Sequence, residues 1–138
     1  MRLDVYLAET HLIAEQQGSI LDDTAERLRQ GATLTPLEQN GVLHALQVLV
    51  ENSIGKAKNT LKSYGKPVPV SAYDAIKEVG KLEQWDAQQL ERWRSIIGLR
   101  NKIVHEYMNI DMDTIQVLVR ERHYNPIITY LLSPIVKK

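Results

Sequence analysis

Apolar residues recur at helical spacing along nearly the whole chain. In residues 3–30 they recur every one to two helical turns, and Gly31 predicts the end of that helix. A second run covers residues 36–63. It opens with a proline at the first helical position, and Thr35 and Glu38 have the spacing of a capping box. The pattern therefore predicts two long helices joined by a short loop.

The second half of the chain continues in the same way. Residues 66–69 read Lys-Pro-Val-Pro, which predicts an extended connector. Capping patterns at Ser71 and Asp86 open a short helix and a long one. A last helix is predicted to begin at Asp111 or Asp113, with the Asn-Pro pair at 125–126 kinking or interrupting it before the apolar face resumes.

Together these segments predict an all-α protein. We expect an antiparallel up-and-down bundle of four long helices and one short helix, in a single domain over residues 1–138, because no stretch alternates long enough to favour a sheet. The chain has no cysteine, which excludes disulfides, thiolate metal sites and cysteine nucleophiles. No apolar run approaches the roughly 20 residues of a membrane span, and no signal core opens the chain. We expect a cytoplasmic protein without a membrane partner.

Charge is balanced overall but not locally. A net charge of zero argues mildly against nucleic-acid binding. Residues 51–66 nevertheless carry four lysines against one acid, and residues 92–107 carry four arginines and lysines against one acid. Such runs are usually solvated helix faces. The alternative is a local basic cleft on a neutral protein.

Residues 99–107 carry the most informative chemistry. They place Arg, Asn, His and Tyr at the end of a helix that otherwise bears core residues. On a helix Asn101 and His105 share a face, and Arg100 and Tyr107 nearly coincide. Arg100 and His105 are separated by about 140° and about 7.5 Å, so they are poorly placed to bond each other but can converge on one phosphate. By residue type alone, a surface Arg and a His near the helix C-terminus are the commoner interpretation.

The string Arg-Asn-x-x-Val-His-x-Tyr, residues 100–107, resembles the signature of HepT-like proteins of the HEPN ribonuclease superfamily. Their motif is Arg, any four residues, His, any residue, Tyr. Residues 53–55, the connector at 67–69 and the turn at 109–111 are similar to the same proteins, so the resemblance covers most of the chain. Lys56 departs from it, because many relatives carry an acidic residue there, on the second-helix face of the expected cleft.

The resemblance implies a HEPN-type bundle that dimerises around a cleft between two motif helices. It also implies a metal-independent endoribonuclease without cofactor, acting as the toxin of a toxin–antitoxin pair. Arg100 would hold the scissile phosphate and His105 would act as general acid or base, because imidazole changes charge near neutral pH. Asn101 and Lys102 would support the site or contact RNA. Since one chain has one motif histidine and the reaction needs an acid and a base, we expect a homodimer to supply two.

Tyr107 is the expected point of regulation. The resemblance implies a cognate nucleotidyltransferase antitoxin, of the minimal (MNT) type, that transfers AMP to this tyrosine. A phosphodiester there would occupy the fork of Arg100 and repel RNA. The alternative hypothesis is a non-catalytic helical dimer that uses the same motif to bind a nucleotidyltransferase partner or a nucleotide. The intact motif favours the ribonuclease.

Other residues that could stack on RNA or bind a metal are better interpreted as structural or solvated side chains. Trp85 and Trp93 could stack on RNA bases, but their apolar neighbours at helical spacing favour the core. His11 and Glu15 stand four residues apart, and a solvated pair is favoured over a metal site. His44 lies among apolar neighbours and is interpreted as a structural or interface residue.

Overall fold

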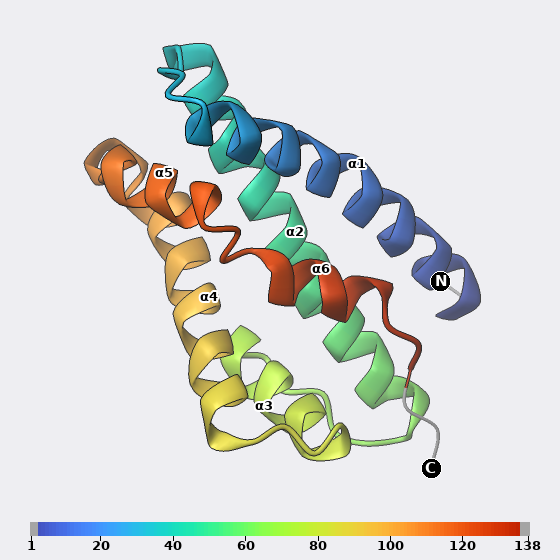
Figure 1. Cartoon of the computed structure of the whole chain (residues 1–138). Helices are drawn as coiled ribbons and strands as arrows, with labels where there is room; N and C mark the ends of the chain where they lie inside the picture. The colour runs from blue at the N-terminus through green and yellow to red at the C-terminus, as the bar shows by residue number, and fades with distance from the viewer. Residues whose placement is uncertain (1–2, 136–138) are drawn as a thin grey trace.

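The computed structural model describes residues 3–135, and every regular element in that range is helical (Figure 1). No helix in the same range is both long and apolar enough to cross a membrane. The elements, in chain order, are α1 (Leu3–Arg29), α2 (Pro36–Ser63), α3 (Ala72–Leu82), α4 (Ala87–His105), the 3₁₀ turn η1 (Tyr107–Asn109), α5 (Met112–Arg120) and α6 (Asn125–Leu132).

The predicted helix ends are confirmed where they depend on local chemistry. α2 begins with a capping box, in which the Thr35 side chain accepts from the Glu38 amide at 3.1 Å and Glu38 accepts from the Thr35 amide at 2.9 Å. Asp86 and Gln89 make the same reciprocal pair at the start of α4. α1 stops just before Gly31, whose φ of +89° is one that a side chain disfavours.

The last predicted long helix is instead divided into α5 and α6. α5 ends at Arg120, and Arg122 adopts a positive φ of 57° in the turn that follows. Pro126 lies in the first turn of α6, where its missing N–H costs nothing but where its ring would clash with an unbroken preceding turn. The described residues therefore contain three long and three shorter α-helices, not four long and one short.

The α5–α6 turn is anchored to α1. Tyr124 is buried in this turn, and its hydroxyl donates to Oδ1 of Asp22 at 2.5 Å. Arg122 pairs with the same carboxylate at 3.0 Å. Burial, together with this hydrogen bond, raises the pKa of Tyr124. The break in the helix thus places a tyrosine where it joins the first helix to the last segment.

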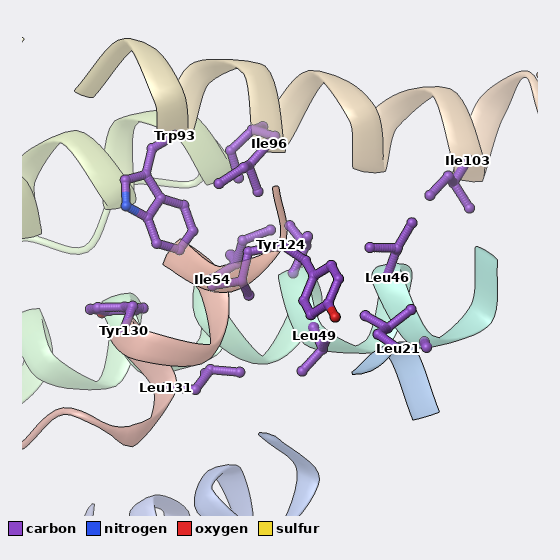
Figure 2. Packing of buried hydrophobic residues seen from close by; sticks show 14 of the residues in the cluster. Leu21, Leu46, Leu49, Ile54, Trp93, Ile96, Ile103, Tyr124, Tyr130 and Leu131 are labelled. Carbon is purple, nitrogen blue, oxygen red and sulfur yellow. The ribbon is translucent and has the colours of Figure 1, made fainter. Parts of the chain in front are cut away.

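α2 is the centre of the packing. It contacts α1, α3, α4 and α6, while α1 is also covered by α5 and α6. Figure 2 shows residues from several helices meeting in one apolar cluster. Each fully buried aliphatic side chain of this kind contributes roughly 1.5–3 kcal/mol. The residues labelled there are Leu21, Leu46, Leu49, Ile54, Trp93, Ile96, Ile103, Tyr124, Tyr130 and Leu131.

The basic character expected of residues 51–66 is only partly a surface property, because Lys56 is buried with 1% of its surface exposed. Its ammonium donates to the carbonyls of Tyr130 at 2.5 Å and Ser133 at 2.6 Å, and to the Ser133 hydroxyl at 3.1 Å. It also lies 4.5 Å from the centre of the Tyr130 ring. Burial lowers the pKa of Lys56 to about 8, against the opposing effect of the Glu83 carboxylate. Lys56 therefore secures the end of α6 to α2.

The two tryptophans stack on each other. Their ring centres are 5.6 Å apart and the planes are almost parallel, and both meet the Tyr130 ring edge to face. Trp93 is buried in the core, as predicted, and Trp85 is half-buried. Gly80 makes the stack possible, since a Cβ at that position would lie 2.8 Å from the Trp85 ring.

Candidate active site

α4 ends inside the 100–107 segment. It stays helical through His105, and Glu106 then leaves the helical conformation with φ −132° and ψ 33°. η1 follows directly and contains Tyr107. Arg100 and His105 therefore project from the last two turns of α4, while Tyr107 belongs to a separate short turn.

Arg100 lies at the contact between α4 and α2. Its Nε is 3.2 Å from Oε1 of Glu51, a charge contact without the angles of a hydrogen bond. The Arg100 side chain is 18% exposed and that of Glu51 is 46% exposed. Because the carboxylate remains well solvated, a pair of this kind contributes only about 0–1 kcal/mol. The guanidinium is thus held in place by an acceptor that another anion can replace.

Tyr107 contacts α2 at a second point. Tyr107 is about half-exposed, and its hydroxyl donates to Oδ1 of Asn40, near the start of α2. The partners on α2 rise from residue 40 to residue 51 while those on α4 and η1 fall from 107 to 100. α2 and the end of α4 therefore run antiparallel, with a strip of α2 beside the motif.

His105 faces solvent. Its side chain is exposed, and so is that of Asn101 on the same face. Within residues 3–135 neither side chain makes a hydrogen bond or an ion pair, so Asn101 does not orient the His105 ring in this structure. An exposed imidazole without a protein partner can contact a bound ligand directly.

Lys102 lies on another side of α4. It borders a pocket of about 320 Å³ between the end of α4 and the start of α5, together with Leu99, Glu106, Ile110, Asp111 and Thr114. The structure thus sets Arg100 and Tyr107 against one face of α2 at points eleven residues, about 16 Å, apart, points Asn101 and His105 outward, and places Lys102 toward α5.

The partners on α2 were not predicted from the sequence. Asn40 and Glu51 stand eleven positions apart, which is close to three helical turns and puts both on one face. That spacing is visible in the sequence. Which helix the face lies beside depends on tertiary packing, and no local signal reports it.

Comparisons with known proteins identify the family. The model of the family described as Ribonuclease HepT-like matches residues 12–133, and the chain belongs to that family. A protein of Archaeoglobus fulgidus described as "Putative RNase" is 28% identical over 123 residues, which cover 88% of this chain and 84% of that protein. The resemblance carried by residues 100–107 is therefore confirmed at the level of the family.

A solved structure supports the same fold. It is described as "Crystal structure of the toxin-antitoxin with AMP-PNP", and it matches with a TM-score of 0.73 and 15% identity over 91% of this chain and 97% of the matched chain. At that identity the likeness extends to the fold alone. The fold places the motif at the end of a long helix, beside the surface of another.

Proposed function

We propose that this protein is a metal-independent endoribonuclease and the toxin of a toxin–antitoxin pair. The observation that carries the proposal is the end of α4, where a pre-positioned guanidinium with a replaceable partner precedes a solvent-facing imidazole. Membership in a ribonuclease family supports the reaction class. Asn101 and Lys102 would contact the RNA on either side of His105.

In the proposed reaction, Arg100 binds the scissile phosphate in place of Glu51. The ribose 2′-hydroxyl loses its proton to a base and forms a bond to phosphorus, while the bond from phosphorus to the 5′-oxygen breaks and that oxygen takes a proton from an acid. The products are a 2′,3′-cyclic phosphate and a 5′-hydroxyl. His105 is one of the two proton-transfer groups, and the Arg100 fork stabilises charge on the phosphoryl oxygens.

A homodimer is part of the proposal. Large apolar side chains are highly exposed around the motif, at Met108 beside Tyr107 and at Leu37 beside Asn40, and Val104 is also exposed. Exposed apolar groups gathered near one another favour an association surface. A second copy placed here would border a shared cleft with its own motif helix and would bring a second His105.

The partner proposed for Tyr107 is a nucleotidyltransferase antitoxin. The Tyr107 oxygen would attack the α-phosphorus of ATP, releasing pyrophosphate and leaving AMP on the tyrosine. Its half-exposed position in a short turn, with one neutral hydrogen bond to Asn40, supports access by such an enzyme. The new phosphodiester would add negative charge to the face of α2 that also carries the Arg100 contact, and would repel an incoming RNA backbone. Tyr107→Phe is expected to retain RNA cleavage and to gain no AMP mass in the presence of the antitoxin and ATP.

The test of the ribonuclease is RNA cleavage in EDTA by unmodified protein. His105→Ala is expected to lower the rate by about 10²–10⁴-fold, and the parent products should carry 2′,3′-cyclic phosphate ends. His123→Ala is the matched control, since His123 is exposed at the α5–α6 turn, away from the motif. If parent protein with a bare Tyr107 cleaves no RNA, the proposal is wrong and a non-catalytic binding module takes its place.

A further inference from the structure

Gly98 stands on the solvent-facing side of α4, a helix at the edge of the molecule (Figure 1). A Cβ at this position would meet nothing within 4 Å beyond its chain neighbours and the backbone of α4 itself. Since alanine stabilises a helix interior more than glycine does, the fold alone would favour a side chain here. Nothing in the described chain therefore requires a bare backbone at Gly98, whereas a bound molecule that approaches closely would.

The nearest polar neighbours of Gly98 are available to a ligand. Asn101 and Lys102 follow it by three and four positions, so both share its face, and helical side chains lean toward the N-terminus, over the turn that carries Gly98. Both are exposed, and within residues 3–135 neither side chain makes a hydrogen bond or an ion pair, Glu106 beside Lys102 included. His105 follows two turns later, within about 20° around the helix. The space above Gly98 is thus bordered by an amide and an ammonium, with the motif imidazole farther along.

The other charged groups on this face are already paired. Arg94 lies one turn before Gly98, but its guanidinium is over the Tyr73 ring of α3, 5.0 Å from the ring centre, and donates to the Tyr73 hydroxyl at 3.4 Å. Glu91 contacts Arg94 at 4.0 Å and lies seven positions, about 10 Å, from Gly98. Among the described residues, the charge beside Gly98 that has no partner is therefore the positive one of Lys102.

The composition of this face favours a polyanion over a protein. Val104 is the large apolar residue that α4 exposes strongly, and it lies about 120° around the helix from Gly98. The centres of protein interfaces are apolar and depleted in charge, which this face is not. The dimer surface proposed above, which includes Val104, leaves the Gly98 face open. A polar face with an unpaired cation matches the phosphates of RNA.

We propose that the face of α4 around Gly98 binds the sugar–phosphate backbone of the RNA substrate. A phosphate other than the scissile one lies against the bare helix at Gly98, where Lys102 and Asn101 donate to its oxygens. The inference rests on the proposed ribonuclease activity and adds a substrate-binding subsite to it. Contacts to phosphate carry no sequence information, so the subsite accepts single-stranded RNA of any sequence.

The test adds one methyl group at each of two open helical glycines. Gly98→Ala and the control Gly41→Ala, in α2, should both raise Tm by about 2–5 °C, because alanine is the better helix former and neither Cβ meets a neighbour. Gly98→Ala alone should raise KM about tenfold, for poly(A) and poly(U) alike, and should change kcat less than twofold. A variant that is more stable and yet binds RNA more weakly has not lost its fold.

Lys102 is tested separately through the salt dependence. Lys102→Gln should raise KM for both polymers and reduce the slope of log KM against log salt concentration by about one, the value for one phosphate contact. Lys66→Gln, at an exposed position of the connector between α2 and α3, should leave the slope unchanged. An unchanged slope in Lys102→Gln would remove the ammonium from the subsite.

The failure of this inference can be distinguished from that of the proposed function. If the parent cleaves RNA and Gly98→Ala keeps the parent KM for both polymers, the ribonuclease stands and the subsite is refuted. If Gly98→Ala weakens self-association and its KM returns to the parent value at higher protein concentration, a second copy covers this face and the inference is wrong. If the parent cleaves no RNA, the proposed function fails, and equal affinity of the parent and Gly98→Ala for the same polymers in fluorescence anisotropy overturns the subsite as well.

Discussion

Two cations on neighbouring helices, Lys56 on α2 and Arg100 on α4, have opposite surroundings. Lys56 is 1% exposed and satisfied by three oxygen acceptors from the end of α6. Arg100 keeps 18% of its side chain exposed and has a single carboxylate partner, itself 46% exposed. A cation whose acceptors are all internal stabilises the fold, whereas one with a replaceable, solvated partner can bind a further anion.

The largest expected effect comes from removing Arg100, the cation whose partner is solvated. Arg100→Ala should lower RNA cleavage by about 10²–10³-fold, because a donor to the developing charge is lost. It should reduce the free energy of unfolding by no more than about 1 kcal/mol, since Glu51 is solvated without it. Arg94→Ala, on the same helix, is the control. Cleavage at the parent rate by Arg100→Ala would show that the guanidinium is not part of the site.

Removing Lys56, the buried cation, should lower stability and leave RNA cleavage unchanged. Lys56→Met is expected to lower the free energy of unfolding by about 2 kcal/mol, because the carbonyls of Tyr130 and Ser133 lose their donor. Cleavage per folded molecule should be unchanged. Lys62→Met, at an exposed position of the same helix, should lie within about 0.5 kcal/mol of the parent in urea unfolding. Equal stability of the two variants would refute the structural role of Lys56.

Alkaline pH should change the free energy of unfolding of the parent but not that of Lys56→Met. The pKa of Lys56 is lowered by burial to about 8, while an unfolded lysine titrates near ~10.4. Between pH 8 and pH 10 the unfolded chain therefore keeps a proton that the folded protein has released, and the free energy of unfolding should rise by roughly 1–2 kcal/mol. Unfolding measured at several pH values should show this rise in the parent and not in Lys56→Met. Tyr130, whose pKa burial raises, has the opposite effect only above about pH 10.

The smallest expected effect concerns the partner of Arg100. Glu51→Gln removes the carboxylate that an RNA phosphate must displace, so KM for RNA should fall by about two- to fivefold at low salt with kcat little changed. Glu91→Gln, which alters an exposed pair on α4, is the control. A higher KM in Glu51→Gln would mean that the carboxylate positions Arg100 for binding and does not compete with RNA.

Features set by neighbours in the sequence could be predicted from the sequence. The cap of α2 at Thr35, that of α4 at Asp86 and the stop at Gly31 each depend on a few adjacent residues, and all three are confirmed. The family could be inferred for the same reason, because Arg100, His105 and Tyr107 lie within eight positions. That residues 1–138 form one domain stays a prediction.

Features set by distant contacts could not be predicted. Lys56 has the appearance of a surface lysine until its partners, more than seventy residues away, are known. The proline at 126 predicted a break in the last helix. The positive φ of Arg122 and the burial of Tyr124, however, follow from packing on α1. His44 has apolar neighbours in the sequence but is exposed in the fold. Its exposure depends on the face of α2 that it occupies, and adjacent residues lie on different faces.

The contact between Tyr124 and Asp22 limits how early during synthesis the helical bundle can be completed. The two residues are 102 positions apart, so α1 cannot be anchored to the α5–α6 turn until almost all of the described chain has left the ribosome. The motif of α4 is synthesised before the segment that closes the bundle over α1. During translation, the emerging polypeptide therefore passes through a stage in which Arg100 and His105 exist but the completed bundle does not, and long-range closure of this kind is a slow step of folding.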